Sequence, residues 1–165
     1  KTMRPAMNTR RRPSRSAIRP PSSRKPPNTS VYALTIHDRL ATEVIVAADT
    51  IVVLDGRIIG KPRDREDAIQ ILSALSGRIH EVITGVVILH NGAEEAFGQT
   101  TEVHFKPLTA SQIEYYVDHY QPYDKAGAYA IQEWIGAVGI DRINGCFYNV
   151  MGLPVSQVAE RLSRL

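Results

Sequence analysis

From residue 44 onward, short apolar segments separated by turn residues predict β-strands. Residues 44–48 form an apolar run that is typical of a buried strand, and this run ends at Asp49. Residues 51–54 and 57–59 are two further apolar segments with an Asp-Gly pair between them. Because an Asp-Gly pair readily adopts the positive φ angles of a tight type I′ turn, these two segments predict a β-hairpin.

The following part of the chain predicts more strands. Residues 82–89 form a long apolar run, and Asn91 with Gly92 marks a second turn that leads toward residues 96–97. Residues 102–105 alternate between polar and apolar side chains, as expected of a half-buried strand. Since hairpins occur among both strands and helices, the predicted sheet is mixed rather than all-parallel.

Three segments carry apolar residues at helical spacing. The first helix begins at Asp64 as N-cap and stops near Gly77, the second begins at a capping box opened by Thr109 and stops at Pro122, and the third follows Pro154. The predicted buried positions are Ala68, Ile71, Leu72 and Leu75, then Ile113, Tyr116, Val117 and Tyr120, then Val155, Val158, Ala159 and Leu162. Together these elements predict an α/β fold with a mixed twisted sheet flanked by helices.

The length and composition narrow the class of protein. The 165 residues suffice for one domain with a hydrophobic core, and the apolar fraction of 43% is ordinary for a globular protein. No apolar run approaches the roughly 20 residues of a membrane span. A single cysteine, Cys146, excludes an internal disulfide and suits a reducing compartment. These features predict a soluble cytoplasmic protein without a membrane partner.

Charge divides the chain into two segments. Residues 1–43 carry ten Lys or Arg and two acidic residues, a net charge of +8, whereas residues 44–165 carry ten basic and fifteen acidic residues, a net charge of −5. The Arg/Pro/Ser-rich first segment is predicted to be a disordered leader, and residues 44–165 the folded domain. One interpretation of the leader is an arm that binds nucleic acid through its basic residues. Its composition favours a second interpretation, a non-native segment such as the product of a shifted reading frame.

Asp49 is the first residue to consider for chemistry, because it closes a predicted apolar strand. In open α/β sheets, ligands gather beyond the carboxyl ends of strands. A carboxylate there can bind Mg²⁺ or Mn²⁺, or take a proton from water. The alternative is that Asp49 only terminates the strand through an Asx-type turn, and the spacing alone does not separate the two.

Two lysines lie in segments suited to binding phosphate. Lys61 is predicted near a helix N-terminus, where free backbone N–H groups also attract anions. Lys125 lies in a run of small residues that allow close approach to a ligand. The alternatives are a solvated surface lysine for Lys61 and a tight turn with an exposed Asp124–Lys125 ion pair for the second segment.

Other polar and aromatic residues carry weaker signals. Gln132 offers both a donor and an acceptor to a base edge, or is a polar residue on a strand face. Residues 145–154 are predicted to form a buried strand and turn under the last helix, in preference to the lining of a nucleotide cleft. Cys146 is interpreted as a small core residue. The five histidines show no metal-ligand spacing, so no zinc site is expected.

Several of these segments in order resemble the Maf-like nucleoside triphosphate pyrophosphatase family. The resemblance covers roughly three quarters of the chain, from about Val44 to the C-terminus, and rests on Ala48-Asp49-Thr50, Gly60-Lys61-Pro62, Leu75-Ser76-Gly77, Thr84-Gly85-Val86 and residues 124–132 and 149–154. The Lys-Ala-Gly-x-Tyr-x-Ile-Gln spelling is similar to the branch that acts on dTTP and UTP. The family's opening Ser-x-Ser-Pro-Arg-Arg motif has no counterpart in residues 1–43.

The resemblance implies a Maf/ITPase-like fold with a nucleotide cleft and an enzyme that hydrolyses dTTP and UTP to the monophosphate and pyrophosphate. It implies that Asp49 is the catalytic base and the contact of a divalent Mg²⁺ or Mn²⁺ cofactor. Lys61 and Lys125 would neutralise the triphosphate, and Thr50 and Gln132 would bear on base choice. A homodimer is the implied assembly, and nucleic acid is not an expected partner.

Two alternatives belong to other classes. One is a catalytically impaired nucleotide- or nucleic-acid-binding protein that uses the basic leader. The other is a relative of the inosine triphosphate pyrophosphatases, which share a similar architecture.

Overall fold

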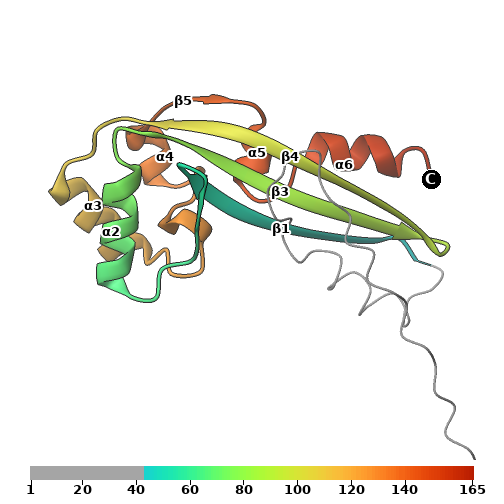
Figure 1. Cartoon of the computed structure of the whole chain (residues 1–165), viewed down its shortest axis with the longest axis horizontal. Helices are drawn as coiled ribbons and strands as arrows, with labels where there is room; N and C mark the ends of the chain where they lie inside the picture. The colour runs from blue at the N-terminus through green and yellow to red at the C-terminus, as the bar shows by residue number, and fades with distance from the viewer. Residues whose placement is uncertain (1–42) are drawn as a thin grey trace, which may run out of the picture.

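A single sheet with helices packed against it makes up the part of the chain that the computed structural model describes, residues 43–165 (Figure 1). Its elements are β1 (Ile45–Leu54), β2 (Arg57–Ile59), α2 (Arg65–Leu75), β3 (Ile79–His90), β4 (Ala93–Phe105), α3 (Ala110–Tyr120), the 3₁₀ helix η1 (Ala126–Ala128), α4 (Trp134–Gly139), β5 (Ile140–Asn144), α5 (Phe147–Val150) and α6 (Val155–Leu162). The predicted leader, apart from Glu43, lies outside the described residues.

The sheet has the strand order β2-β1-β3-β4-β5. The α/β class with flanking helices is confirmed. Every pairing among the described strands is antiparallel, whereas the sequence predicted a mixed sheet. The tight turns explain the direction, because Asp55 and Gly56 (φ 49° and 77°) and Asn91 and Gly92 (φ 48° and 79°) turn each strand back beside its predecessor. Both predicted hairpins are thereby confirmed.

Two strands are longer than their sequence patterns predicted. Residues 45–48 and 51–54 belong to one strand, β1, and residues 96–97 and 102–105 belong to one strand, β4; residue 44 lies just before β1. Asp49 therefore does not end a strand; it lies within β1, opposite Gly85 of β3. The cause is β3, whose 12 residues provide a continuous backbone ladder for both neighbours. Ladder hydrogen bonds extend each strand across polar positions that interrupt its apolar pattern.

The two faces of the sheet differ in what covers them. Val52 of β1 and its ladder partner Val82 pack into the main core with helical residues, so we call their side of the sheet the helical face. Side chains alternate along a strand, and Ile45 and Val87 lie on the other side, which we call the opposite face. Adjacent residues of β1 thus point to different faces.

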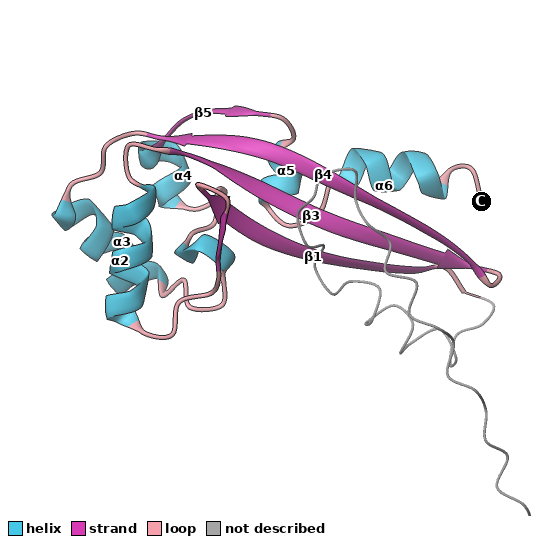
Figure 2. Cartoon of the chain, viewed as in Figure 1, coloured by secondary structure: helices cyan, strands magenta, loops and turns pink. Residues whose placement is uncertain are grey.

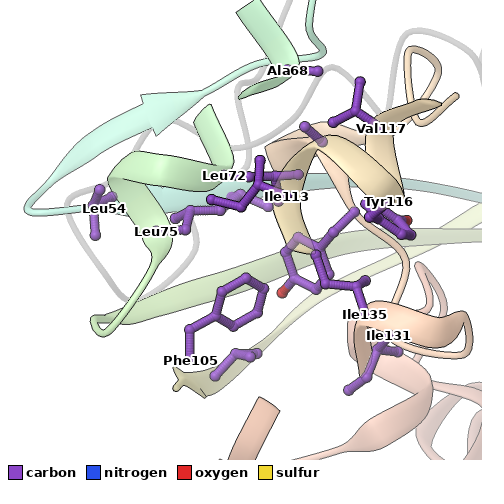
Figure 3. Packing of buried hydrophobic residues seen from close by; sticks show 14 of the residues in the cluster. Leu54, Ala68, Leu72, Leu75, Phe105, Ile113, Tyr116, Val117, Ile131 and Ile135 are labelled. Atoms are coloured by element: carbon purple, nitrogen blue, oxygen red, sulfur yellow. The ribbon is translucent and has the colours of Figure 1, made fainter. Parts of the chain in front are cut away.

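The main core lies at one end of the sheet, where α2, α3 and α4 gather (Figure 2). Figure 3 shows its buried side chains converging from these helices and from the ends of the long strands. Both predicted N-caps are confirmed. At the start of α2, Asp64 accepts a hydrogen bond from the Asp67 N–H at 2.9 Å, and at the start of α3, Thr109 forms a complete capping box with Gln112. The predicted buried face of α3 holds except at Tyr120, which is 37% exposed.

The helix α6 lies over the other half of the sheet and buries less than predicted. Val158 packs against Val86 and Ile88 on the helical face, whereas Val155, Ala159 and Leu162 are exposed. No helix in residues 43–165 combines the length and apolarity needed to cross a bilayer.

A buried polar pair lies within the main core. The Nε2 atom of His80 is 2.7 Å from the Tyr129 hydroxyl, and the rings of His80, Phe105 and Tyr129 meet edge to face. His80 is only 2% exposed. Burial lowers the pKa of His80 to about 4, and the nearby His104 adds to this effect. The neutral imidazole is therefore part of the folded core.

We expect the stability of the fold to decrease as the pH falls from 7 to 5. An unfolded histidine, with a pKa of about 6.5, binds a proton in this range that folded His80 does not, so acid stabilises the unfolded chain. The free energy of unfolding should drop by about 2 kcal/mol from this residue, as measured by urea titration at the two pH values. The drop should shrink in His80→Gln. His90→Gln, at the end of the same strand, is the control, and an equal drop in all three proteins would contradict the assignment.

Candidate functional site

Asp49 and Thr50 lie side by side near the outer edge of β1. Only residues 52–54 of β1 pair with β2, so the edge of residues 45–51 has no ladder partner among residues 43–165. Asp49 is half-buried on the opposite face, and its Oδ1 atom accepts a hydrogen bond from the Thr50 N–H at 3.0 Å. Its other carboxylate oxygen keeps its capacity to accept. The two residues border the same open edge although their side chains point to different faces.

Lys61 and Lys125 come together at the end of the sheet that holds the main core. Lys125 Nζ lies 3.0 Å and 3.3 Å from the two carboxylate oxygens of Asp124. The hydrogen bond from Lys125, together with the weaker field of Lys61, lowers the pKa of the Asp124 carboxyl. The loops that carry the lysines are joined by the Gly127 N–H, which donates to the Gly60 carbonyl at 3.1 Å. Lys125 therefore pairs with an exposed carboxylate, and Lys61 lies on the loop that is bonded to the Lys125 loop.

Lys61 lies in the loop between the β1–β2 hairpin and α2, three residues before the N-cap Asp64, so its predicted place near a helix N-terminus is confirmed. Gln132 is exposed in the turn that precedes α4, so the alternative of a polar residue on a strand face does not hold. Both side chains are exposed and accessible to a ligand.

Glu133 is a site neighbour that the sequence did not indicate. Its carboxylate accepts a hydrogen bond from the Tyr116 hydroxyl and lies 4.0 Å from Lys125 Nζ. The same hydroxyl accepts from the Ala130 N–H at 3.1 Å. Burial, with help from this carboxylate, raises the pKa of Tyr116. The turn at residues 130–133 is thus tied to α3, but no sequence signal links Glu133 to a lysine eight positions earlier.

Thr50 points to the helical face, where it meets the segment at residues 146–152. Its hydroxyl lies 2.8 Å from Thr84 Oγ1 and 3.2 Å from the Gly152 carbonyl. The predicted buried strand at residues 145–154 is not present. The segment instead contains the short helix α5, because positive φ angles at Gly145 and Gly152 bend the chain. Cys146 is half-buried at the start of α5 and carries a free thiol, rather than lying in the core.

The predicted site residues fall into separate groups. The lysine loops pack onto β1 through Gly127, where an added Cβ atom would lie 2.9 Å from Val52 Cγ2. Asp49 is three residues from Val52, about 10 Å along the strand, and on the opposite face. No contact among the described residues joins Asp49 to Lys61 or Lys125. A cavity of about 330 Å³ at the start of β3 and the end of β4 contains none of the predicted site residues.

The residues present suit a metal ion that is held mainly by its substrate. Within residues 43–165, no three His, Cys, Asp or Glu side chains are grouped as metal ligands. Mg²⁺ commonly keeps several waters and is bound by one or two carboxylates together with substrate phosphates. The free oxygen of Asp49 can supply one such ligand at the open edge of β1.

Comparison with known proteins gives one family and a consistent set of relatives. The sequence model of the family described as "Maf-like protein" matches residues 16–165, a range that begins inside the predicted leader. Over 119 residues the chain is 54% identical to a protein of Porphyromonas gingivalis, covering 72% of this chain and 60% of that protein. It is 48% identical over 123 residues to one of Bacteroides thetaiotaomicron (74% and 64%) and 52% identical over 122 residues to one of Cytophaga hutchinsonii (74% and 56%). All three are named dTTP/UTP pyrophosphatase; the chain spans about three fifths of their length.

The close contact between Gly127 and Val52 predicts an effect on stability. Gly127→Ala should destabilise the fold in two ways, through its positive φ, which costs roughly 1 kcal/mol, and through overpacking, which costs roughly 1–3 kcal/mol more. Gly56→Ala is the matched control, because Gly56 has a similar φ of +77° but open space around its Cβ position. Urea unfolding of both variants measures the difference, and equal losses would show that the lysine loops are not held by this contact.

Proposed function

The chain belongs to the Maf-like protein family, and we propose that it is a nucleoside triphosphate pyrophosphatase that hydrolyses dTTP and UTP to the monophosphate and pyrophosphate. Support comes from relatives of that name at about 50% identity. The family match includes every site residue that the sequence singled out. The structural observation that carries the proposal is that the loops of Lys61 and Lys125 are bonded to one another through Gly60 and Gly127, and that the Lys125 loop packs onto β1, the strand that bears Asp49 and Thr50.

Charge is the first obstacle to this reaction, because water must attack a polyanionic chain between its α and β phosphorus atoms. Lys61 and Lys125 would bind the phosphate oxygens and lower the repulsion. The present partner of Lys125, Asp124, is 76% exposed and easily replaced by a more highly charged phosphate. Glu133, at 4.0 Å, would keep the Lys125 ammonium in place while Asp124 is exchanged for the ligand.

Asp49 would orient the attacking water and accept its proton. One oxygen of this carboxylate accepts from the Thr50 N–H, and the other would accept the proton of the water. Asp49 would also be the protein ligand of a divalent cation, Mg²⁺ or Mn²⁺. When bound, such a cation supplies positive charge that neutralises phosphate oxygens.

The nucleobase would meet Thr50 and Gln132. The Thr50 hydroxyl lies beside the 146–152 segment, and the exposed Gln132 amide offers both a donor and an acceptor. The proposal also includes a cytoplasmic location, which the single cysteine supports, and a homodimer, which the family resemblance suggests.

We expect Asp49→Asn to reduce pyrophosphate release from dTTP and UTP by a factor of roughly 10²–10⁴, since the amide cannot accept the proton of water. The measurement is a coupled pyrophosphate assay with Mg²⁺ and with Mn²⁺. Asp141→Asn, an exposed carboxylate on β5, is the control and should keep full activity. If the unmodified chain released no pyrophosphate from either nucleotide, the proposed function would be wrong, and a nucleotide- or nucleic-acid-binding protein would remain.

Lys125→Met should raise KM for UTP about tenfold and leave the fold intact, because the lysine acts on the phosphates through its charge. Lys61→Met should act in the same direction. Lys106→Met, which removes a lysine in the distant cavity, should leave KM unchanged. Steady-state kinetics at two salt concentrations will separate these cases, since the substrate's attraction to the lysines weakens with ionic strength. An unchanged KM in both site variants would remove the lysines from the mechanism.

A further inference from the structure

Basic side chains gather at a second place, the cavity of about 330 Å³ at the start of β3 and the end of β4. Its volume lies at the lower end of the range for sites that bind small molecules. The charged side chains that line it are those of Arg78, Lys106, Arg142 and Asp141. Three cations and one carboxylate give the lining a net charge of +2 with His104 neutral, whereas the predicted domain as a whole carries −5.

A β-bulge brings two adjacent charged residues to this cavity. The ladder between β4 and β5 shifts register at residues 104–105, where Asp141 is the extra residue of β5. Adjacent residues of a regular strand point to opposite faces, yet Asp141 and Arg142 both line the cavity. Bulges are over-represented next to functional sites because they redirect side chains in this way.

Backbone hydrogen bonds hold together the segments that form the cavity. The Gly77 N–H donates to the Lys106 carbonyl at 3.1 Å, and the Phe105 N–H donates to the Arg78 carbonyl at 2.9 Å. The Lys106 N–H in turn donates to the Gly139 carbonyl, just before β5, at 2.8 Å. The cavity is therefore formed by the backbone in advance of any ligand, as sites for small molecules usually are.

Two of the cations at the cavity have no ion-pair partner. Residues 44–165 contain ten Lys or Arg. Those that form ion pairs among the described residues are Arg63, Arg65, Arg78, Lys125, Arg161 and Arg164. Those that form none in this part of the chain are Arg57, Lys61, Lys106 and Arg142. Half of the unpaired cations thus line one cavity, although a carboxylate lies on the same lining.

The chemistry of these side chains favours phosphate as the ligand. An unpaired ammonium or guanidinium can bind an anion without first losing a protein partner, and a guanidinium binds phosphate through two parallel hydrogen bonds. Arg78 supplies a third cation, and its partner Asp55 has a side chain that is 64% exposed and can be exchanged for a ligand. The net charge of +2 matches a phosphate monoester, which carries about −1.5 to −2 at pH 7.

We propose that this cavity is a second binding site, for a small molecule that carries a phosphate group. Arg142 and Lys106 bind the phosphate oxygens, and the exposed side chains of Ile79 and Pro107 contact the carbon atoms of an ester. The cavity contains none of the residues of the candidate site, so this inference does not depend on the proposed hydrolysis.

The first test follows the backbone amide resonances of the full chain by NMR during titration with inorganic phosphate at constant ionic strength. Amides of residues 77–79, 104–106 and 141–142 should shift and saturate at millimolar phosphate or below. Titrations with pyrophosphate and UMP distinguish the source of the phosphate group. Similar affinities mean a site for phosphate itself, and tighter binding of UMP means a site for an ester; either result upholds the proposal.

Three results of this titration would overturn it. One is the absence of saturation at these amides, and another is the same shift with chloride in place of phosphate. The third is a phosphate response confined to the loops of Lys61 and Lys125, which would leave the cavity without a ligand.

The second test compares variants by calorimetric titration with the phosphate compound that binds most tightly. Arg142→Gln should weaken its affinity at least about tenfold, because charge-assisted hydrogen bonds are lost, and Lys106→Gln should act in the same direction. Arg57→Gln is the matched control, since Arg57 is also exposed and unpaired but does not line the cavity. An unchanged affinity in Arg142→Gln, or an equal loss in Arg57→Gln, would overturn the proposal.

Discussion

The register of β1 against β3 is the constraint on which the rest of the molecule depends. It sets Thr50 opposite Thr84 and Asp49 opposite Gly85 along one uninterrupted ladder. A shift of one residue would move every side chain of β1 to the other face of the sheet. Val52 and Leu54, which are 2% and 6% exposed in the main core, would then face away from the helices. The hydrophobic effect therefore also decides which face carries the carboxylate and which carries the hydroxyl.

The same packing places the lysines. The helices α2 and α3 and the 3₁₀ helix η1 share one core with the end of β1, and Gly127 allows η1 to approach Val52 closely. Because the Gly127 N–H bonds to the Gly60 carbonyl, this approach also fixes the loop before α2. Lys61 and Lys125 come from segments more than 60 positions apart, yet their loops are bonded to one another. The packing of the main core therefore determines where the two lysine loops lie.

Buried polar groups add constraints to those of apolar packing. A hydroxyl or amide that leaves water needs a partner, so each one restricts the positions of its neighbours. In the core, His80 Nε2 and the Tyr129 hydroxyl are partners, His80 Nδ1 has none among the described residues, and the burial of this imidazole is expected to make the fold sensitive to acid. On the helical face, Thr84 and Asn149 restrict a segment next to Thr50.

Local signals were sufficient for the turns and caps, because each depends on a few adjacent residues: the two Xaa-Gly turns, the Asp64 cap and the Thr109 capping box all occur as predicted. The candidate residues Asp49, Thr50, Lys61, Lys125 and Gln132 were also found from local motifs, and their roles stay predictions. No local sequence pattern predicted the lengths of the strands, the single buried position of α6 or the turn around Gln132. They depend on ladders and contacts between distant segments. Thr84, Asn149 and Glu133 were missed for the same reason: a side chain's hydrogen-bond partners exist only once the strands and loops that carry them have been brought together.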